Sequence, residues 1–109
     1  MKKENRVKKN TEFYNIIQNG KKYYTKCFNI YINDSDSNTY RFGISVSKKI
    51  GNAVVRNKIK RQLREIIHNN KKYYSINKDY IIIVKNDYLN YDFASINQVF
   101  VDLFEKNSK

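Results

Sequence analysis

The chain has 109 residues, and its 22 Lys and Arg against 10 Asp and Glu give a net charge of +12. This excess is too large for an ordinary soluble enzyme and indicates a polyanionic partner, either a nucleic-acid backbone or an anionic membrane surface. The length predicts one domain over residues 1–109 that folds without metal or disulfide staples, and no apolar run approaches the roughly 18 residues of a membrane span.

The first elements are a basic arm and a short helix. Residues 1–9 are rich in Lys and Arg and are not followed by an apolar stretch, so we predict a mobile basic arm and not a secretory signal. A helix capped by Asn10 or Thr11 follows and ends near Gly20. Its apolar residues are Phe13, Ile16 and Ile17.

Two alternating segments come next and predict strands. Residues 26–32 alternate between apolar and polar positions, residues 33–38 form a polar turn, and residues 40–46 alternate again, so we interpret them as the two arms of a hairpin. The residues expected to face the core are Phe28, Ile30, Ile32, Tyr40, Phe42, Ile44 and Val46, and those expected to face outward include Cys27, Asn29, Tyr31, Arg41, Gly43 and Ser45.

Residues 52–68 predict a helix, capped by Asn52, with one apolar and one cationic side. The apolar arc consists of Val55, Ile59, Leu63, Ile66 and Ile67, and the opposite side of Asn57, Lys60, Arg61, Arg64 and His68, with Arg56 and Lys58 on its flanks. Cations on a surface helix are often only solvated charges. Here Glu65 is the only acid between Lys48 and His68, so repulsion between the cations is poorly compensated and a bound polyanion is favoured.

The last third of the chain predicts a loop, a strand and a helix. Residues 71–78 are expected to form the loop, and the aliphatic run 79–84 is typical of a central strand covered on both faces. Apolar residues then recur at helical spacing between about 90 and 106. The predicted order is α, β, β, α, β, α, with a further short strand near Tyr23 left open.

Residues suited to catalysis by the protein itself are scarce. His68 is the only histidine and Cys27 the only cysteine, which excludes an intrachain disulfide and a cysteine-rich zinc site. Among the acids only Asp34 and Asp36 cluster, in the polar turn, whereas a two-metal nuclease needs several converging carboxylates. We therefore expect neither catalytic residues nor metal ligands in this chain.

The 10 Tyr and 6 Phe, interleaved with cations, are instead typical of proteins that stack bases and bind phosphates. If the first helix lies along the outer face of the strands, Phe13 and Ile17 border a groove with Tyr31 and Ser45, and such a groove suits an extended single strand. The alternative is that Phe13 and Ile17 form the core stripe of their helix, and the sequence leaves both readings open.

The centre of the chain reads Arg41-Phe-Gly-Ile-Ser-Val-Ser-Lys-Lys-Ile-Gly-Asn-Ala-Val-Val-Arg-Asn-Lys-Ile-Lys-Arg-Gln-Leu-Arg64. This run resembles the protein subunit of bacterial ribonuclease P. The likeness extends to residues 5–10 with the following Phe13, to residues 79–83 and to the last helix, so it covers nearly the whole chain.

The resemblance implies an α+β two-layer sandwich of αβββαβα order. Its small mixed sheet is packed by helices, as in domain 2 of ribosomal protein S5, and contains a left-handed βαβ crossover. The resemblance further implies a subunit of a cytoplasmic endoribonuclease in which a large RNA, with bound Mg²⁺, removes the 5′ leader of precursor tRNA. The partners expected from it are that catalytic RNA and precursor tRNA, with no membrane and no obligate protein partner.

By position, the resemblance also assigns residues to two surfaces. Binding of the catalytic RNA is assigned to Lys48, Lys49, Asn52, Arg56, Asn57, Lys58, Lys60, Arg61 and Arg64, and the leader groove to Phe13, Ile17, Tyr31 and Ser45. Two positions depart from the family pattern. Lys58 stands where an arginine is common and lacks the planar guanidinium fork, and Ile17 stands where an aromatic is frequent, so stacking should rest on Phe13 and Tyr31.

Two other classes of protein compete with this interpretation. A stand-alone architectural or ribosome-associated protein would bind many RNAs or duplex DNA with similar affinity. A peripheral membrane protein would bind anionic vesicles through the basic helix, but the apolar side of that helix lacks Trp and is needed for the core.

Overall fold

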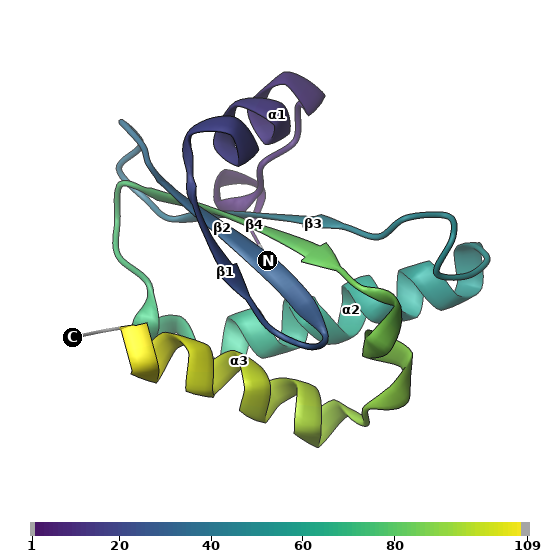
Figure 1. Ribbon diagram of the computed structural model, residues 1–109. Helices are drawn as coiled ribbons and strands as arrows, with labels where there is room; N and C mark the ends of the chain where they lie inside the picture. Colours follow the sequence, from purple (N-terminus) through teal and green to yellow (C-terminus); the bar gives the residue numbers. More distant parts are fainter. Residues whose placement is uncertain (1, 108–109) are drawn as a thin grey trace.

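The computed structural model describes residues 2–107 and shows a four-stranded sheet with helices on both faces (Figure 1). The helices are α1 (Asn10–Asn19), α2 (Ala53–Asn69) and α3 (Phe93–Asn107), and the strands are β1 (Lys21–Tyr24), β2 (Phe28–Asp34), β3 (Arg41–Ser45) and β4 (Lys78–Val84). Short 3-10 turns lie at Lys3–Asn5, Lys71–Tyr73 and Asn86–Asn90. This order confirms the predicted αβββαβα arrangement, including the short strand at Tyr23.

The order of strands across the sheet is β1-β2-β4-β3, which shows that the predicted hairpin between the second and third strands is wrong. β4 lies between them, antiparallel to β2 and parallel to β3, and α2 provides the crossover from β3 to β4. The hairpin is formed instead by β1 and β2. The fully buried Ile81 and Ile82 explain why β4 takes the central place, because a strand that is apolar on both faces must be covered on both.

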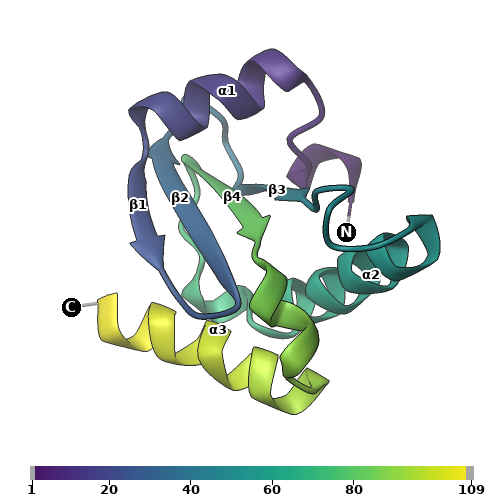
Figure 2. The ribbon, with the colours of Figure 1, turned by 45° about the vertical axis from the view of Figure 1, so that its right-hand side comes forward.

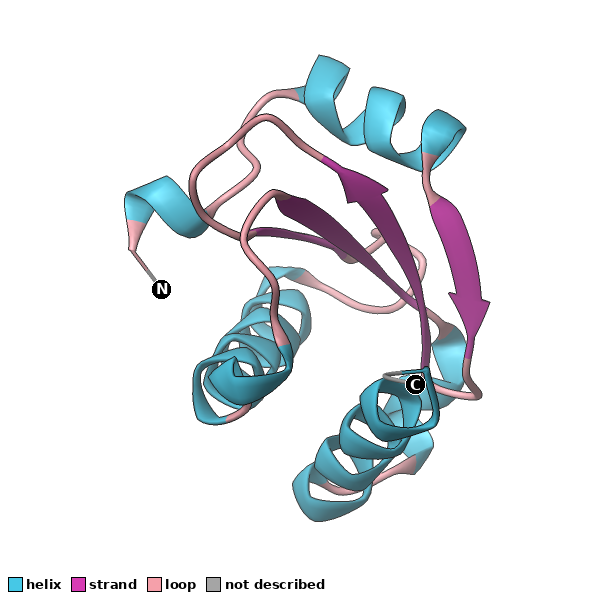
Figure 3. Cartoon of the chain, turned by 90° about the vertical axis from the view of Figure 1, so that its left-hand side faces the viewer, coloured by secondary structure: helices cyan, strands magenta, loops and turns pink. Residues whose placement is uncertain are grey.

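The main core lies between the sheet and the pair α2 and α3, whereas α1 crosses the other face (Figures 2 and 3). The sheet and these two helices form the predicted two-layer sandwich, and α1 adds a partial third layer. Phe28, Ile30 and Phe42 are buried on the core face, as their alternation predicted. Cys27, expected on the outer face, is instead fully buried in the main core, because β2 begins only at Phe28.

The predicted loop 71–78 contributes to this core. Tyr74 packs against Phe42 and Phe104, with ring centroids 4.8 Å and 5.5 Å apart, and its hydroxyl donates to the carbonyl oxygen of Ile67 at 2.9 Å. Burial raises the pKa of the Tyr74 phenol. These contacts fix the carboxyl end of α2 and, with it, the direction of the cationic side of that helix.

Part of the predicted basic arm packs along β3. Val7 is buried and its backbone N–H donates to the carbonyl oxygen of Phe42 at 2.9 Å. The side-chain amide of Asn5 donates to Thr39 Oγ1 and to the carbonyl oxygen of Tyr40, each at 2.8 Å. Residues 5–7 therefore bring the exposed basic side chain of Arg6 close to the sheet.

α1 begins and ends abruptly. Lys9 precedes it without a side-chain cap, so the prediction of capping by Asn10 or Thr11 is wrong. At its other end, the Gly20 N–H donates to the carbonyl oxygen of Ile16 at 2.7 Å, and a Cβ on Gly20 would lie 2.6 Å from that oxygen. Glycine therefore permits the tight exit that takes the chain directly from α1 into β1.

Candidate nucleic-acid interface

The cationic side of α2 is formed as the sequence predicts. The Asn52 side chain accepts a hydrogen bond from the Val55 N–H at 3.1 Å and caps the helix. Ile59, Leu63, Ile66 and Ile67 are buried in the main core, and Val55 packs at its edge. Burial of this apolar arc turns the opposite side of α2 toward solvent.

The cations of this side are exposed or half-buried and have little negative charge around them. Asn57, Lys58, Arg61 and His68 are exposed, and Arg56, Lys60 and Arg64 are half-buried. The first turn of α2 contains no acidic residue, so the positive end of the helix dipole is also uncompensated. Within residues 2–107, the ion pairs join Arg41 to Glu12 and Asp79, and Lys78 to Asp34; none of them involves a cation of α2.

Two arginines of this side are partly held by the protein. Arg56 Nε donates to the Gly51 carbonyl oxygen at 3.2 Å, which directs the side chain back over the start of the helix. Arg64 Nε is buried and has no hydrogen-bond partner within the described part of the chain.

The face of the sheet opposite the main core is covered only in part by α1. Its strands are in register, so that two rows of side chains cross all four strands: Lys22, Tyr31, Ile81 and Gly43 in one row, and Tyr24, Asn29, Ile83 and Ser45 in the next. We call the surface formed by these eight residues the open face. It contains the predicted groove residues Tyr31 and Ser45.

α1 is held over one end of this face by a three-way ion pair. Arg41 binds Asp79 through two hydrogen bonds of 2.8 Å each, and its Nη1 donates to Glu12 Oε2 at 2.7 Å. Asp79 and Glu12 raise the pKa of Arg41, and the hydrogen bond from Arg41 lowers the pKa of Glu12. Because Glu12 belongs to α1 and Arg41 and Asp79 to the sheet, this group fixes where Phe13, the next residue of α1, lies.

Phe13 and Ile17 belong to a small second core and also border the open face. They are half-buried and pack, together with Tyr31 and Ile83, against the buried Val7, Ile16 and Ile81. These contacts agree with the core-stripe alternative, and the position of the two residues beside the open face is compatible with a groove. The arrangement brings Phe13, Ile17 and Tyr31 together, while Ser45 lies exposed one row further along the sheet.

A hollow of about 250 Å³ joins the open face to α2. It is lined by residues from the arm, α1, β3 and α2, among them Arg6, Lys8, Phe13, Gly43, Lys60 and Arg64. Part of its lining is aromatic, from Phe13 and Phe42, and part is cationic, and Val7 and Ile44 add aliphatic surface. A chain that carries flat bases on an anionic backbone matches the aromatic and the cationic parts of this lining.

Lys48 and Lys49 lie on the loop between β3 and α2 and are exposed. They lie three and four residues after Ser45 and precede the positive end of α2. Asn52, predicted to bind RNA, uses its side-chain oxygen as the helix cap. Its contribution therefore includes shaping the start of the cationic helix.

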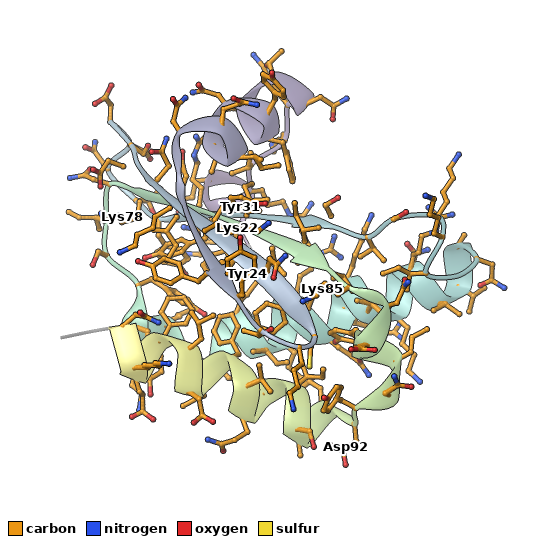
Figure 4. All side chains as sticks on the ribbon, in the orientation of Figure 1. Lys22, Tyr24, Tyr31, Lys78, Lys85 and Asp92 are labelled. Carbon is orange, nitrogen blue, oxygen red and sulfur yellow. The ribbon has the colours of Figure 1, made fainter. Side chains whose placement is uncertain are left out.

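Four residues beside these surfaces were not predicted from the sequence. Lys22 and Tyr24 lie on the open face, on the strand nearest its free edge, and Arg6 and Lys8 line the hollow. The signal for the first two was present, because Lys21-Lys22-Tyr23-Tyr24 follows Gly20 and alternates between faces once a strand is assumed. Figure 4 shows Lys22, Tyr24 and Tyr31 close together on the sheet.

The side chains that could bind a metal ion are dispersed over the described part of the chain. In the described residues 2–107, no group of three or more His, Cys, Asp or Glu side chains could hold a metal ion. Cys27 is buried, and burial raises the pKa of its thiol. None of the described helices is long and apolar enough to cross a membrane. What the surfaces offer is positive charge, aromatic rings and hydrogen-bond donors.

Comparison with known proteins gives consistent matches over the whole fold. The family model described as Ribonuclease P matches residues 1–108. The chain is 43% identical over 107 residues to the ribonuclease P protein component of Mycoplasma mycoides, covering 97% of this chain and 98% of that protein. It is 38% identical over 108 residues to that of Bacillus cereus, covering 98% and 94%.

Solved structures agree with the sequence relatives. The RNase P protein from Staphylococcus aureus superimposes with a TM-score of 0.85 at 34% identity, covering 93% of each chain. The RNase P protein from Thermotoga maritima superimposes with a TM-score of 0.82 at 27% identity, covering 93% of this chain and 96% of that one.

Proposed function

The chain belongs to the ribonuclease P protein family, and on that premise we propose that its two surfaces have separate roles in the holoenzyme. Members of this family are the protein subunit of an endoribonuclease whose catalysis resides in RNA. In this chain, the cationic side of α2 binds the catalytic RNA. The groove between α1 and the open face binds the 5′ leader of precursor tRNA.

The contact between Phe13 and the sheet is the observation that carries the leader assignment. Phe13 is packed well enough to be held in place but remains half-exposed beside Tyr31, so a base can stack there without repacking the protein. The hollow beside Phe13 leads to Lys60 and Arg64 of α2. A leader bound in the groove would thus extend to the surface assigned to the catalytic RNA, which cleaves the precursor tRNA.

The assignment of α2 to the catalytic RNA rests on charge that the protein does not neutralise. Lys58, Arg61 and their neighbours have no acidic partner within the described residues, and Lys48 and Lys49 extend the same surface. Binding to RNA phosphates would release counterions and relieve the repulsion between these cations.

The other components follow from the same proposal. Magnesium ions of the holoenzyme are bound mainly by the RNA, in which the catalysis of this family resides. The particle acts in the cytoplasm on precursor tRNA and needs no further protein. The chain forms one domain, with described residues of the basic arm lying next to α2.

Cleavage of precursor tRNA at low magnesium, by a bacterial ribonuclease P RNA with and without this protein, tests the proposal. We expect the protein to stimulate cleavage and to be inert without the RNA. Stimulation that is equal for substrates with long and with very short leaders would contradict the leader groove. Absence of stimulation, with similar affinity for unrelated RNAs, would support a general nucleic-acid-binding protein instead.

A further inference from the structure

The open face continues beyond Tyr31 to the free edge of the sheet at β1. Lys22 lies opposite Tyr31 and Tyr24 opposite Asn29, so both side chains lie on the same face as Phe13 and Tyr31. Among residues 2–107, β1 pairs only with β2 and has no neighbouring strand on its other side. The open face therefore extends one strand past the aromatic residues that the groove was expected to contain.

Lys22 links two tyrosine rings on this part of the sheet. Its Nζ lies 4.6 Å from the ring centroid of Tyr24 and 5.5 Å from that of Tyr31 (Figure 4). Both distances are within the range of cation–π attraction. A single ammonium group thus lies close to both rings.

Tyr24 is unusually open for an aromatic residue held in this way. It is 71% exposed, whereas Tyr31 and Phe13 are half-buried. The ring therefore presents a flat apolar surface to solvent with a cation beside it. A nucleobase matches the ring, and the phosphate that follows the base matches the cation, since stacking and charge are the two contacts that bind single strands without reading sequence.

The three aromatic rings are spread across the sheet, from the β3 side to the edge strand β1. Phe13 comes from α1 and lies over β3, Tyr31 comes from β2, and Tyr24 comes from β1. One row of side chains across the four strands is about 14 Å long at the usual spacing of strands. The rings are thus spread along the path of a strand that crosses the sheet and do not form a single compact pocket.

We propose that Lys22 and Tyr24 form an additional subsite for single-stranded RNA, which takes one leader nucleotide further along the strand than those held by Phe13 and Tyr31. Tyr24 stacks on the base and Lys22 neutralises a neighbouring phosphate. This inference rests on the proposed leader groove and adds to it a binding position at the edge strand.

The test uses the holoenzyme and a set of precursor tRNAs in which each leader nucleotide in turn is abasic, with binding measured under conditions that block cleavage. In the unaltered protein, each base that is stacked should cost about fivefold or more in affinity when it is removed. With Tyr24→Ala, removal of the base at one of these positions should no longer reduce affinity, while removal at the other positions should reduce it as before. Tyr24→Phe should restore the original profile, meaning the loss of affinity measured at each leader position.

Two matched variants separate the subsite from general effects. Tyr14 is 66% exposed on α1, so Tyr14→Ala removes a similar ring outside the open face and should leave the profile unchanged. Lys21 lies next to Lys22 on the same strand but on the other face, near Tyr23. Lys22→Gln should lower the salt dependence of leader binding by about 0.7 in log–log slope, and Lys21→Gln should not.

The outcomes distinguish this inference from the proposed function. If Phe13→Ala changed the profile and Tyr24→Ala left it intact, the subsite at Lys22 and Tyr24 would be overturned and the leader groove would stand. A profile that is flat in the unaltered protein would overturn the leader groove itself. If Tyr24→Ala weakened all substrates equally, including mature tRNA, Tyr24 would act on folding or on the RNA subunit, and the subsite would be rejected.

Discussion

Arg41 and Asp79 lie side by side on β3 and β4 and form a bidentate pair, Nε to Oδ1 and Nη2 to Oδ2, at 2.8 Å each. Only 6% of the Asp79 side chain is exposed, so Arg41 provides the counter-charge for a nearly buried carboxylate. The remaining nitrogen of the fork reaches Glu12 of α1. One arginine therefore ties two strands together and also fixes the helix that covers them.

Replacing Arg41 should destabilise the protein strongly, because Asp79 would be left buried without a counter-charge. We expect Arg41→Ala to lower the free energy of unfolding by about 3 kcal/mol, and Arg41→Lys to recover only part of it because lysine lacks the fork. Urea unfolding followed by circular dichroism measures both. Lys78→Ala breaks the exposed pair with Asp34 and is the control, with an expected loss below about 1 kcal/mol. Equal losses for Arg41→Ala and Lys78→Ala would contradict the special role of Arg41.

The same group makes stability depend on pH. The pKa of Glu12 in the folded protein is lowered below its ordinary value of 4.5 by the hydrogen bond from Arg41. Its contribution is therefore fully present above pH 4.5 and is lost as the pH falls through the lowered pKa. The difference in unfolding free energy between the unaltered protein and Glu12→Gln should be constant from pH 7 to about pH 5 and shrink in more acid solution. If this difference in unfolding free energy grew toward acid pH, it would contradict a lowered pKa of Glu12 in the folded protein.

The faces of the strands were predictable from sequence, but their neighbours were not. Alternation placed Phe42 inward and Gly43 outward because side chains on a strand change face at every residue. Alternation carries no information on which strands pair, and the insertion of β4 between β2 and β3 depends on long-range packing. Arg41 illustrates the consequence. It was expected to face outward to solvent, and it does lie on that face, but α1 covers it and makes it an internal link.

The candidate surfaces were predictable to a similar extent. Helical spacing alone separated the buried Ile59 and Leu63 from the exposed Arg61. Periodicity could not show that residues 5–7 of the arm pack against β3 and bring Arg6 to the hollow, because that contact joins segments far apart in sequence. Lys22 and Tyr24 were missed for the related reason that β1 is only four residues long.

Loss of the Phe13 ring should weaken binding of the leader selectively. In the holoenzyme, Phe13→Ala should reduce affinity for leader-bearing precursor tRNA by about 1 to 3 kcal/mol, the usual contribution of one stacked base, and leave mature tRNA nearly unaffected. Competition binding with the two RNAs measures the difference. Circular dichroism of the variant checks that the small core under α1 is still formed. Losses of equal size for both RNAs would mean that Phe13 acts only in packing.

The cations of α2 should control the salt dependence of binding to the catalytic RNA. Arg61→Ala and Arg64→Ala should each weaken assembly and reduce the slope of log affinity against log salt by about 0.7 to 0.9, the value for one lost phosphate contact. Lys106→Ala, in the last turn of α3, removes an exposed cation elsewhere and is the control. A slope unchanged by both arginine variants would exclude them from the interface.

The position of the Phe13 ring should depend on the absence of a side chain at residue 43. A Cβ on Gly43 would lie 2.5 Å from Phe13 Cζ and 2.7 Å from Ile81 Cδ1, closer than packed atoms allow. Both are ends of side chains, so Gly43→Ala should be accommodated by moving the Phe13 ring and not by unfolding the sheet. We expect a cost of about 1 to 3 kcal/mol in stability together with a selective loss of affinity for leader-bearing precursor tRNA.

A double-mutant cycle tests whether the two effects have one cause. In the Phe13→Ala background the ring is already absent, so adding Gly43→Ala should cost much less leader affinity than it does in the unaltered protein. The cycle is measured as binding of precursor and mature tRNA by the four reconstituted holoenzymes. Additive losses would show that Gly43 affects leader binding by a route other than Phe13. Strong coupling would mean that Gly43 affects leader binding by leaving room on β3 for the Phe13 ring from α1.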